Sequence, residues 1–157
     1  TESRELMREP PRGWPRIASA VFYDDAPAAI DWLSRAFGFE VRLRIEGEGG
    51  RIEYSELTFD GGLIMVSQVG GKSGERAFGG SPRATGGLNT QALCICVDDA
   101  DAMAERARAA GGKVVREPTT TDYGDDYWAD RTCEVVDLEG HHWWFMQRVR
   151  EQKSSGK

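Results

Sequence analysis

The chain contains two copies of one short pattern, and this duplication limits its possible folds more than any other feature. Residues 23–26 (YDDA) match residues 97–100 (VDDA) at an offset of 74 residues. A glycine suited to ending a helix recurs at the same offset, and a glutamate and a turn glycine recur at an offset of 78. These matches are Gly38 with Gly112, Glu56 with Glu134, and Gly62 with Gly140. Repetition at a fixed spacing predicts a repeated structural unit.

Both copies predict the same order of elements, which is one strand, one helix and three strands. In the first copy, an Asp pair caps a helix in which Ile30, Leu33 and Phe37 form one apolar stripe. The predicted helices are 28–37 and 100–110, and the predicted strands are 17–23, 39–46, 51–59, 63–69, 90–97, 113–117, 128–136 and 141–148. We therefore expect an α+β fold in which two βαβββ units form curved mixed sheets around a cleft.

The remaining segments differ from these units in composition. The N-terminal segment is rich in proline and charge, the middle segment contains seven glycines, and the C-terminal segment is polar without periodicity. We expect an arm at 1–15, a first unit at 16–69, a linker at 70–89, a second unit at 90–148 and a tail at 149–157. The two units together would form one domain, 16–148.

Charge and cysteine content narrow the choice of partners and location. The net charge is −6, and the basic residues are dispersed rather than gathered into a patch, so we expect no nucleic-acid partner. No apolar run approaches the ~20 residues of a membrane-spanning helix, so we expect no membrane association. Three cysteines, an odd number, favour a reducing, cytoplasmic location.

Two stretches in the second copy resemble a known family. Residues 128–131 (WADR) and 137–143 (DLEGHHW) are similar to the WGDR and DPxGHxW signature of the glyoxalase and bleomycin-resistance branch of the vicinal oxygen chelate superfamily. Ala129 and Leu138 depart from the Gly and Pro of that signature. The resemblance covers residues 16–148 and implies a cleft lined by both units.

In the enzymes of that family, a divalent metal ion lies in the cleft, bound by His, Gln or Glu from the first and last strand of each unit. The repeat offsets map these positions onto Ala18, Val66, Ala92 and Trp144. A divalent cation needs about three or four N, O or S donors. The four mapped side chains supply none, so we expect no metal ion and no cofactor.

The titratable candidates each have a functional and a structural interpretation. Glu56 and Glu134 are candidate general bases, or carboxylates that are exposed or paired with arginine. His141 is expected to close the turn at 137–140, whereas His142 is a candidate for the cleft wall. Cys94 and Cys96 are two residues apart and are expected to project to one face of a strand. They are either a thiolate pair that binds a metal or small apolar residues of a wall.

Aromatic residues gather near the end of the second copy. Because side chains alternate along a strand, Trp143 and Trp144 must point to opposite faces. Arg131 is expected either to anchor an anionic ligand or to form a salt bridge with Asp130 or Asp137. The candidate ligand-binding residues are Phe22, Trp128, Arg131, His142, Trp144 and Met146.

From these patterns and the resemblance, we expect a metal-independent protein that binds a planar or aromatic small molecule, an antibiotic being one example. Exposed sheet edges favour pairing between copies, and the family implies a homodimer. Two alternatives stay open: a metal-dependent lyase, isomerase or dioxygenase with other ligands, and a cofactor-free enzyme with Glu56 or Glu134 as the base. The sequence does not decide whether the protein is an enzyme.

Overall fold

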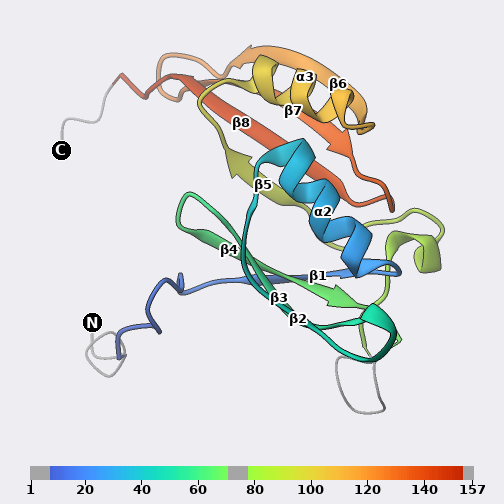
Figure 1. The fold of residues 1–157 in the computed structure, drawn as a ribbon. Helices are drawn as coiled ribbons and strands as arrows, with labels where there is room; N and C mark the ends of the chain where they lie inside the picture. The colour runs from blue at the N-terminus through green and yellow to red at the C-terminus, as the bar shows by residue number, and fades with distance from the viewer. Residues whose placement is uncertain (1–7, 71–77, 154–157) are drawn as a thin grey trace.

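A computed structural model describes residues 8–70 and 78–153 and confirms the two βαβββ units (Figure 1). The first unit comprises β1 (Ser19–Tyr23), α2 (Ala26–Phe37), β2 (Glu40–Glu46), β3 (Ile52–Phe59) and β4 (Gly62–Gln68). The second comprises β5 (Leu93–Cys96), α3 (Ala100–Ala109), β6 (Lys113–Asp122), β7 (Ala129–Val136) and β8 (His142–Arg150). Two short 3-10 helices are η1 (Glu48–Gly50) and η2 (Pro82–Thr85).

Each unit folds into a four-stranded mixed sheet with the same topology. The strand order is β1-β4-β3-β2 in the first sheet and β5-β8-β7-β6 in the second. The first and last strands of each unit pair in parallel, and the other neighbours are antiparallel. Parallel neighbours need a long crossover connection, which the helix and the two intervening strands provide.

The repeated Asp pairs start the helices as predicted. The carboxylate of Asp25 accepts a hydrogen bond from the Ala28 amide at 3.1 Å, and that of Asp99 accepts one from the Ala102 amide at 3.0 Å. These bonds satisfy amide groups that have no partner within the helix. Gly38 ends α2 with φ 85°, a conformation that favours glycine.

One hydrophobic core joins the two units. Both helices contribute to it, and the Phe37 ring of α2 contacts the Trp143 and Phe145 rings of β8 at centroid distances of 5.3 and 4.8 Å. Trp32 of α2 donates a hydrogen bond from its indole to the Ala110 carbonyl at the end of α3, 2.8 Å away. The helix-bearing faces of both sheets therefore pack into one core, and each sheet presents its opposite face, here called its outer face, away from that core.

The main departure from the predicted elements is in the strand β6. It was expected to end at residue 117, but it continues to Asp122 as the partner of β7. Thr119, Thr120 and Thr121 continue the pairing with β7, and threonine favours strands because its branched side chain packs well on a pleated surface. Within the described residues, no helix is long and apolar enough to span a bilayer.

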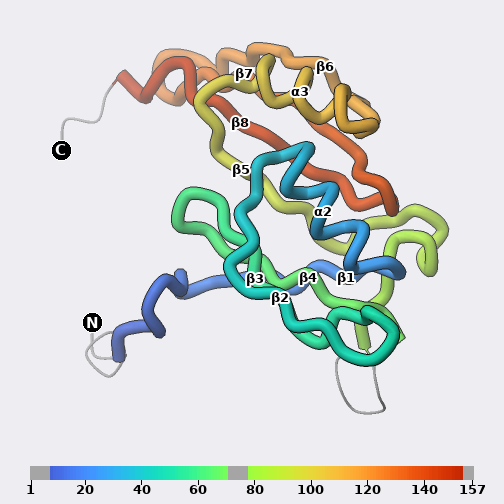
Figure 2. Tube along the Cα trace, viewed as in Figure 1, coloured from blue at the N-terminus to red at the C-terminus, as the bar shows by residue number. Residues whose placement is uncertain are grey.

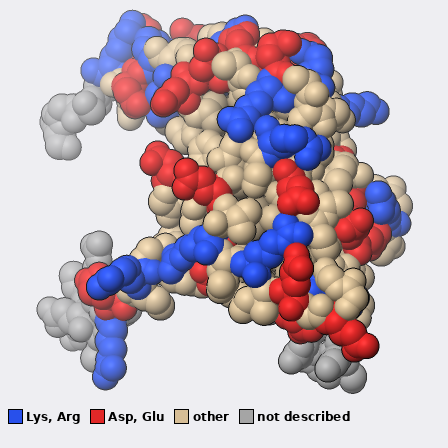
Figure 3. Space-filling model, viewed as in Figure 1, with Lys and Arg blue, Asp and Glu red and all other residues tan. Residues whose placement is uncertain are grey.

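The charged side chains of the described surface are mixed. Figure 3 shows acidic and basic groups interspersed on the face that carries both helices. Several of them form ion pairs between elements, such as Arg44 of β2 with Asp31 of α2 at 2.8 Å. On the face shown, basic groups therefore lie beside acidic ones.

A buried carboxylate connects the β7–β8 turn to the first unit. Asp137 accepts hydrogen bonds from the Tyr23 hydroxyl at 2.6 Å and from the Trp143 indole at 2.9 Å. Its other oxygen accepts bonds from the amides of Glu139 and His141, which shapes the turn. Burial, followed by the nearby Asp137 charge, raises the pKa of Tyr23 well above its ordinary value, so the hydroxyl keeps its proton for this bond.

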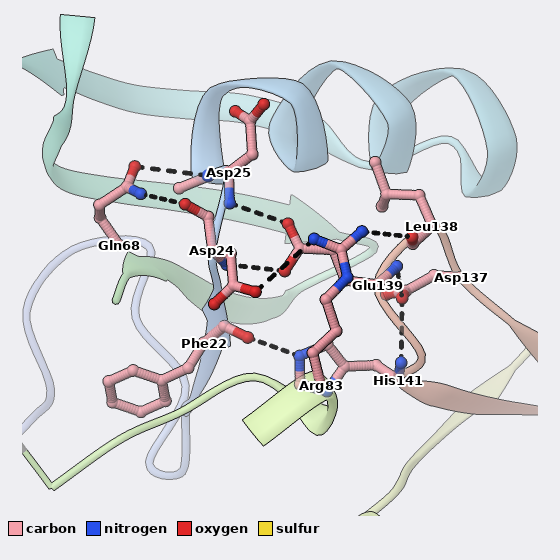
Figure 4. A network of polar contacts seen from close by, with 10 residues as sticks. Phe22, Asp24, Asp25, Gln68, Arg83, Asp137, Leu138, Glu139 and His141 are labelled. Carbon is pink, nitrogen blue, oxygen red and sulfur yellow. Dashed lines mark hydrogen bonds and ion pairs between the residues drawn. The ribbon is translucent and has the colours of Figure 1, made fainter. Parts of the chain in front are cut away.

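Two more side chains of the same turn bind the end of β1 (Figure 4). The Glu139 carboxylate accepts hydrogen bonds from the Asp24 and Asp25 amides at 2.6 and 2.8 Å. The His141 ring donates from Nε2 to the Phe22 carbonyl at 2.6 Å. His141 thus has a structural role, as expected. The expected bond lay within the turn, however, whereas the ring bonds β1 of the first unit.

Replacing Asp137 tests this connection. Asp137→Ala leaves two buried donors without an acceptor, at about 1–3 kcal/mol each, so the free energy of unfolding should fall by about 3 kcal/mol or more. The exposed Asp98 provides the matched control, and Asp98→Ala should change it by less than about 0.5 kcal/mol. Urea unfolding followed by circular dichroism measures both, and equal losses in the two variants would contradict the assignment.

Candidate functional site

A cavity of about 500 Å³ lies along the free edge of β1, where the two units meet. Its walls are β1, the segment 78–91 and the start of β8, and they include Phe22 and His142. A cavity of this size falls within the ~300–1,000 Å³ of small-molecule sites. Two of the predicted ligand-binding residues, one from each unit, therefore line the same cavity.

The segment 78–91 forms a wall of this cavity, and the sequence patterns did not indicate that role. The Asn89 side chain donates to the Gly140 carbonyl at 3.1 Å and accepts from the His142 amide at 3.0 Å. Gly79 lies so close to Phe22 that a Cβ there would come within 2.1 Å of the ring. The glycines of this segment predicted a linker. The residues that could have indicated an ordered wall are Asn89, which bonds the β7–β8 turn, and Pro82, which begins η2. Residues 71–77 of the predicted linker lie outside the described residues.

The outer face of the second sheet continues from the cavity along β8. Trp143 is 1% exposed and belongs to the core, whereas Trp144 is 44% exposed, which confirms the predicted alternation. His142, Trp144 and Met146 share this outer face, with Trp144 between the other two. Four of the six candidate residues therefore lie in one region: Phe22 and His142 line the cavity, and Trp144 and Met146 follow His142 along the outer face.

Trp128 and Arg131 lie apart from these four. The Arg148 guanidinium is 5.0 Å from the centre of the Trp128 ring, at the far end of β8. Arg131 forms a bidentate pair with Asp101 of α3, at 2.6 and 2.9 Å. The expected partners Asp130 and Asp137 were wrong, because alternation along β7 puts Arg131 on the helix side of the sheet and Asp130 on the outer face.

The two glutamates of the repeat lie on different sheets. Glu56 of β3 is buried, with Oε1 3.3 Å from the Arg42 guanidinium and Oε2 accepting a 2.7 Å hydrogen bond from the Tyr54 hydroxyl. Glu134 of β7 is opposite Trp144 in the register of the second sheet. Glu56 is therefore held in an ion pair, and Glu134 is the carboxylate beside the candidate site.

The mapped metal positions need one correction. Val66 is 1% exposed in the core, while Trp144 is on the outer face, so the two are not equivalent. The β1–β4 register pairs Val21 with Val66, and the β5–β8 register pairs Ile95 with Phe145, which makes Met65 the equivalent of Trp144. The repeat offset at the last strand is therefore one residue longer than the turn glycines indicated.

The corrected positions do not fit a divalent metal ion. Ala18, Met65, Ala92 and Trp144 offer no carboxylate, imidazole or amide oxygen, which are the donors that such ions take in enzymes. Among the described residues, no three His, Cys, Asp or Glu side chains gather as a metal site. The donor chemistry here disagrees with a metal centre of the kind the family's enzymes hold.

Comparisons with known proteins place these features in context. The family model described as glyoxalase/bleomycin resistance protein/dioxygenase superfamily matches residues 16–145. An uncharacterized protein of Mycobacterium bovis is 33% identical over 143 residues, covering 87% of this chain and 86% of that protein.

Solved structures share the fold. The structure of TioX from Micromonospora sp. ML1 is 30% identical with a TM-score of 0.67, covering 86% of this chain and 99% of that one. TnmS3 from Streptomyces, described as an antibiotic binding protein, is 18% identical with a TM-score of 0.60, covering 84% of this chain and 93% of that one.

The two adjacent tryptophans of β8 form a matched pair for testing the placement of this face. Trp143→Ala should lower the free energy of unfolding by about 3–5 kcal/mol, because it empties a packed core position. Trp144→Ala should lower it by about 1 kcal/mol or less, since that ring is already half exposed. Urea melts of the two variants make the comparison, and a larger loss for Trp144→Ala would mean that the faces are assigned the wrong way round.

Proposed function

Because the chain belongs to the glyoxalase/bleomycin resistance protein/dioxygenase superfamily, we propose that it binds a planar or aromatic small molecule without the help of a divalent metal ion. The observation that carries this proposal is the position of Trp144. Its half-exposed indole lies on the outer face of the second sheet, next to His142, which also lines the 500 Å³ cavity. An aromatic surface beside a cavity suits a ligand with a flat apolar part and a smaller polar part.

The charge of the cavity wall indicates what that polar part is. Among the described residues, its lining contains no Asp, Glu, Lys or Arg, but it contains the hydroxyls of Ser81 and Thr85 and the amide of Gln91. A charged group would lose its hydration there without gaining a charged partner. A neutral group that forms hydrogen bonds is therefore favoured.

Ser81 supports the presence of a ligand in the cavity. Its side chain is 1% exposed, and its Oγ has no hydrogen-bond partner among the described residues. A buried hydroxyl without a partner costs about 1–3 kcal/mol. Rotation of the Ser81 side chain toward the cavity would let a polar group of a ligand form this hydrogen bond and remove that cost.

The absence of suitable donors at the four family positions favours simple binding over metal catalysis. Trp144 stands where the family's enzymes have a ligand, and it offers a stacking surface in place of a donor atom. The antibiotic-binding description of TnmS3 makes an antibiotic one reasonable class of ligand, since that protein shares this fold.

We also propose that the protein forms a homodimer. The outer face of the second sheet leaves Trp144 half exposed, and β1 and β5 are the edge strands of their sheets. Exposed apolar side chains and unpaired strand edges favour association with a second copy. A second chain across this face would also enclose a ligand more completely than one chain does.

Ligand binding can be tested by quenching of tryptophan fluorescence. With a panel of neutral planar aromatic compounds and with EDTA present, the wild-type protein should bind at least one member with a 1:1 stoichiometry. Trp144→Ala should weaken that binding about tenfold or more, because loss of a stacking partner worth about 1.4 kcal/mol is tenfold in affinity. EDTA should leave the affinity of the wild-type protein unchanged.

A matched control is Trp14→Ala, which removes a partly exposed tryptophan outside the site. It should leave the affinity within about twofold of the wild type, since it touches no proposed contact. Binding that disappears with EDTA and returns with Zn(II) or Mn(II) would contradict the metal-independent proposal. Equal losses for Trp14→Ala and Trp144→Ala would contradict the proposed position of the ligand.

Light scattering coupled to size-exclusion chromatography tests the dimer. At tens of micromolar, the measured mass should be twice the 17.4 kDa of one chain. Trp144→Arg should shift the mass toward the monomer if this face forms the interface, because it introduces a charge at an apolar contact. A wild-type mass of one chain at that concentration would refute the dimer.

A further inference from the structure

Three sulfur-containing side chains gather on the outer face where β5 pairs with β8. Cys94 and Cys96 are exposed, whereas the alternating residues of the same strand, Leu93 and Ile95, pack against the core. The two thiols therefore project from the same side of β5. The parallel register places Cys96 next to Met146, and the Cys96 Sγ lies 4.0 Å from the Met146 Sδ.

The two thiols are close enough to influence each other but are not paired. Burial and then the charge of Cys96 raise the pKa of the Cys94 thiol. Side chains two residues apart on one strand face are separated by about 6.6–6.8 Å, whereas the Cβ atoms of a disulfide are only about 3.5–4.5 Å apart. Both cysteines are free, which leaves their sulfur atoms available to a third atom placed between them.

A second cavity gives these thiols a sheltered side. It has a volume of about 420 Å³ and is lined by both cysteines together with apolar side chains from the first unit, including Ile17, Phe59 and Leu63. These walls give the thiols apolar surroundings on one side, while the thiols themselves stay exposed. This cavity is distinct from the 500 Å³ cavity, which neither cysteine lines.

The donor set selects a particular kind of ion. Thiolates bind several soft or borderline metal ions. A thioether, in contrast, is a ligand for Cu(I) rather than for Zn(II) or harder divalent ions. No imidazole or carboxylate completes a three-residue site here among the described residues, which also disfavours Zn(II). Two thiolates and one thioether can surround Cu(I) with three sulfur atoms.

We propose that Cys94, Cys96 and Met146 form a Cu(I)-binding site on the outer face of the second sheet, beside Trp144, whose partner in the β5–β8 register is Cys94. On binding, two S–H bonds break, two thiolate–copper bonds and one thioether–copper bond form, and two protons are released. Copper enters and remains as Cu(I), so the step needs no oxidant or reductant.

The test is a competition for Cu(I) against a chromophoric chelator, bicinchoninate, under anaerobic conditions with the full chain. The wild-type protein should remove one equivalent of Cu(I) from the chelator. Cys94→Ser and Cys96→Ser should each weaken binding by about 100-fold or more, the upper end of what loss of a supporting partner costs at a metal site. Met146→Leu, which keeps the volume but removes the sulfur, should weaken it by about 10-fold.

The third cysteine provides a matched control. Cys133 of β7 is buried on the helix side of the sheet, where its thiol contacts the Ala100 carbonyl at 3.7 Å, so it cannot reach an ion on the outer face. Cys133→Ala should therefore keep the wild-type Cu(I) affinity, with circular dichroism showing that each variant folds. Zn(II) titration adds a second control, since Met146→Leu should leave Zn(II) binding unaffected while weakening that of Cu(I).

Two results would overturn the proposal. One is a wild-type protein that takes no more Cu(I) from the chelator than the Cys94→Ser/Cys96→Ser double variant does. The other is a folded Met146→Leu variant with unchanged Cu(I) affinity, which would show that the thioether is not a ligand.

Discussion

The Asp137 carboxylate is the interaction on which the arrangement of the two units depends. It accepts hydrogen bonds from a tyrosine of the first unit and a tryptophan of the second, within the turn that begins β8. Both donors lie in the core, where no water replaces a lost acceptor. Glu139 and His141 extend the same connection to the end of β1. The family-like motif at 137–143 thus joins the two units through Asp137, Glu139 and His141.

This connection also shapes the cavity of the proposed binding site. With the β7–β8 turn held against β1, the free edge of β1, the segment 78–91 and the start of β8 enclose a cavity. Its described lining contains no Asp, Glu, Lys or Arg. Because the Trp143 indole is directed inward to Asp137, alternation directs Trp144 outward. Alternation along the single strand β8 therefore places the structural tryptophan, Trp143, and the candidate binding tryptophan, Trp144, on opposite faces. Core packing and the proposed recognition of a ligand therefore involve neighbouring residues that face opposite sides of the sheet.

Much of this fold follows from the sequence, because its signals are local and repeated. Asp25 and Asp99, one from each Asp pair, cap the two helices, and two copies of one element order predict two sheets of one topology. The alternation of Trp143 and Trp144 needs only the geometry of a strand. Longer-range features did not follow: Val66 was mapped one residue away from its true equivalent, and Arg131 was assigned partners from its own neighbourhood in the sequence.

The reasons for these misses are physical. A repeat offset read from turn glycines ignores an extra residue between the turn and the strand, and one residue exchanges the two faces. The Asp101 partner of Arg131 lies on a helix 30 positions earlier, which only the packing of α3 on β7 brings near. The wall at 78–91 is held by Asn89 and Arg83 contacts to the β7–β8 turn, and glycine content alone indicated a linker.

A crystal structure of the protein with a planar aromatic compound that quenches its fluorescence tests the central claim most directly, with data collected at the absorption edges of Zn, Fe and Mn. The account predicts ligand density stacked on the Trp144 indole, with a polar group reaching toward Ser81 in the 500 Å³ cavity and no anomalous peak coordinated by the ligand. An anomalous peak coordinated by the ligand and by side chains of this face would contradict the account. So would a ligand bound elsewhere while Trp144 remains uncovered.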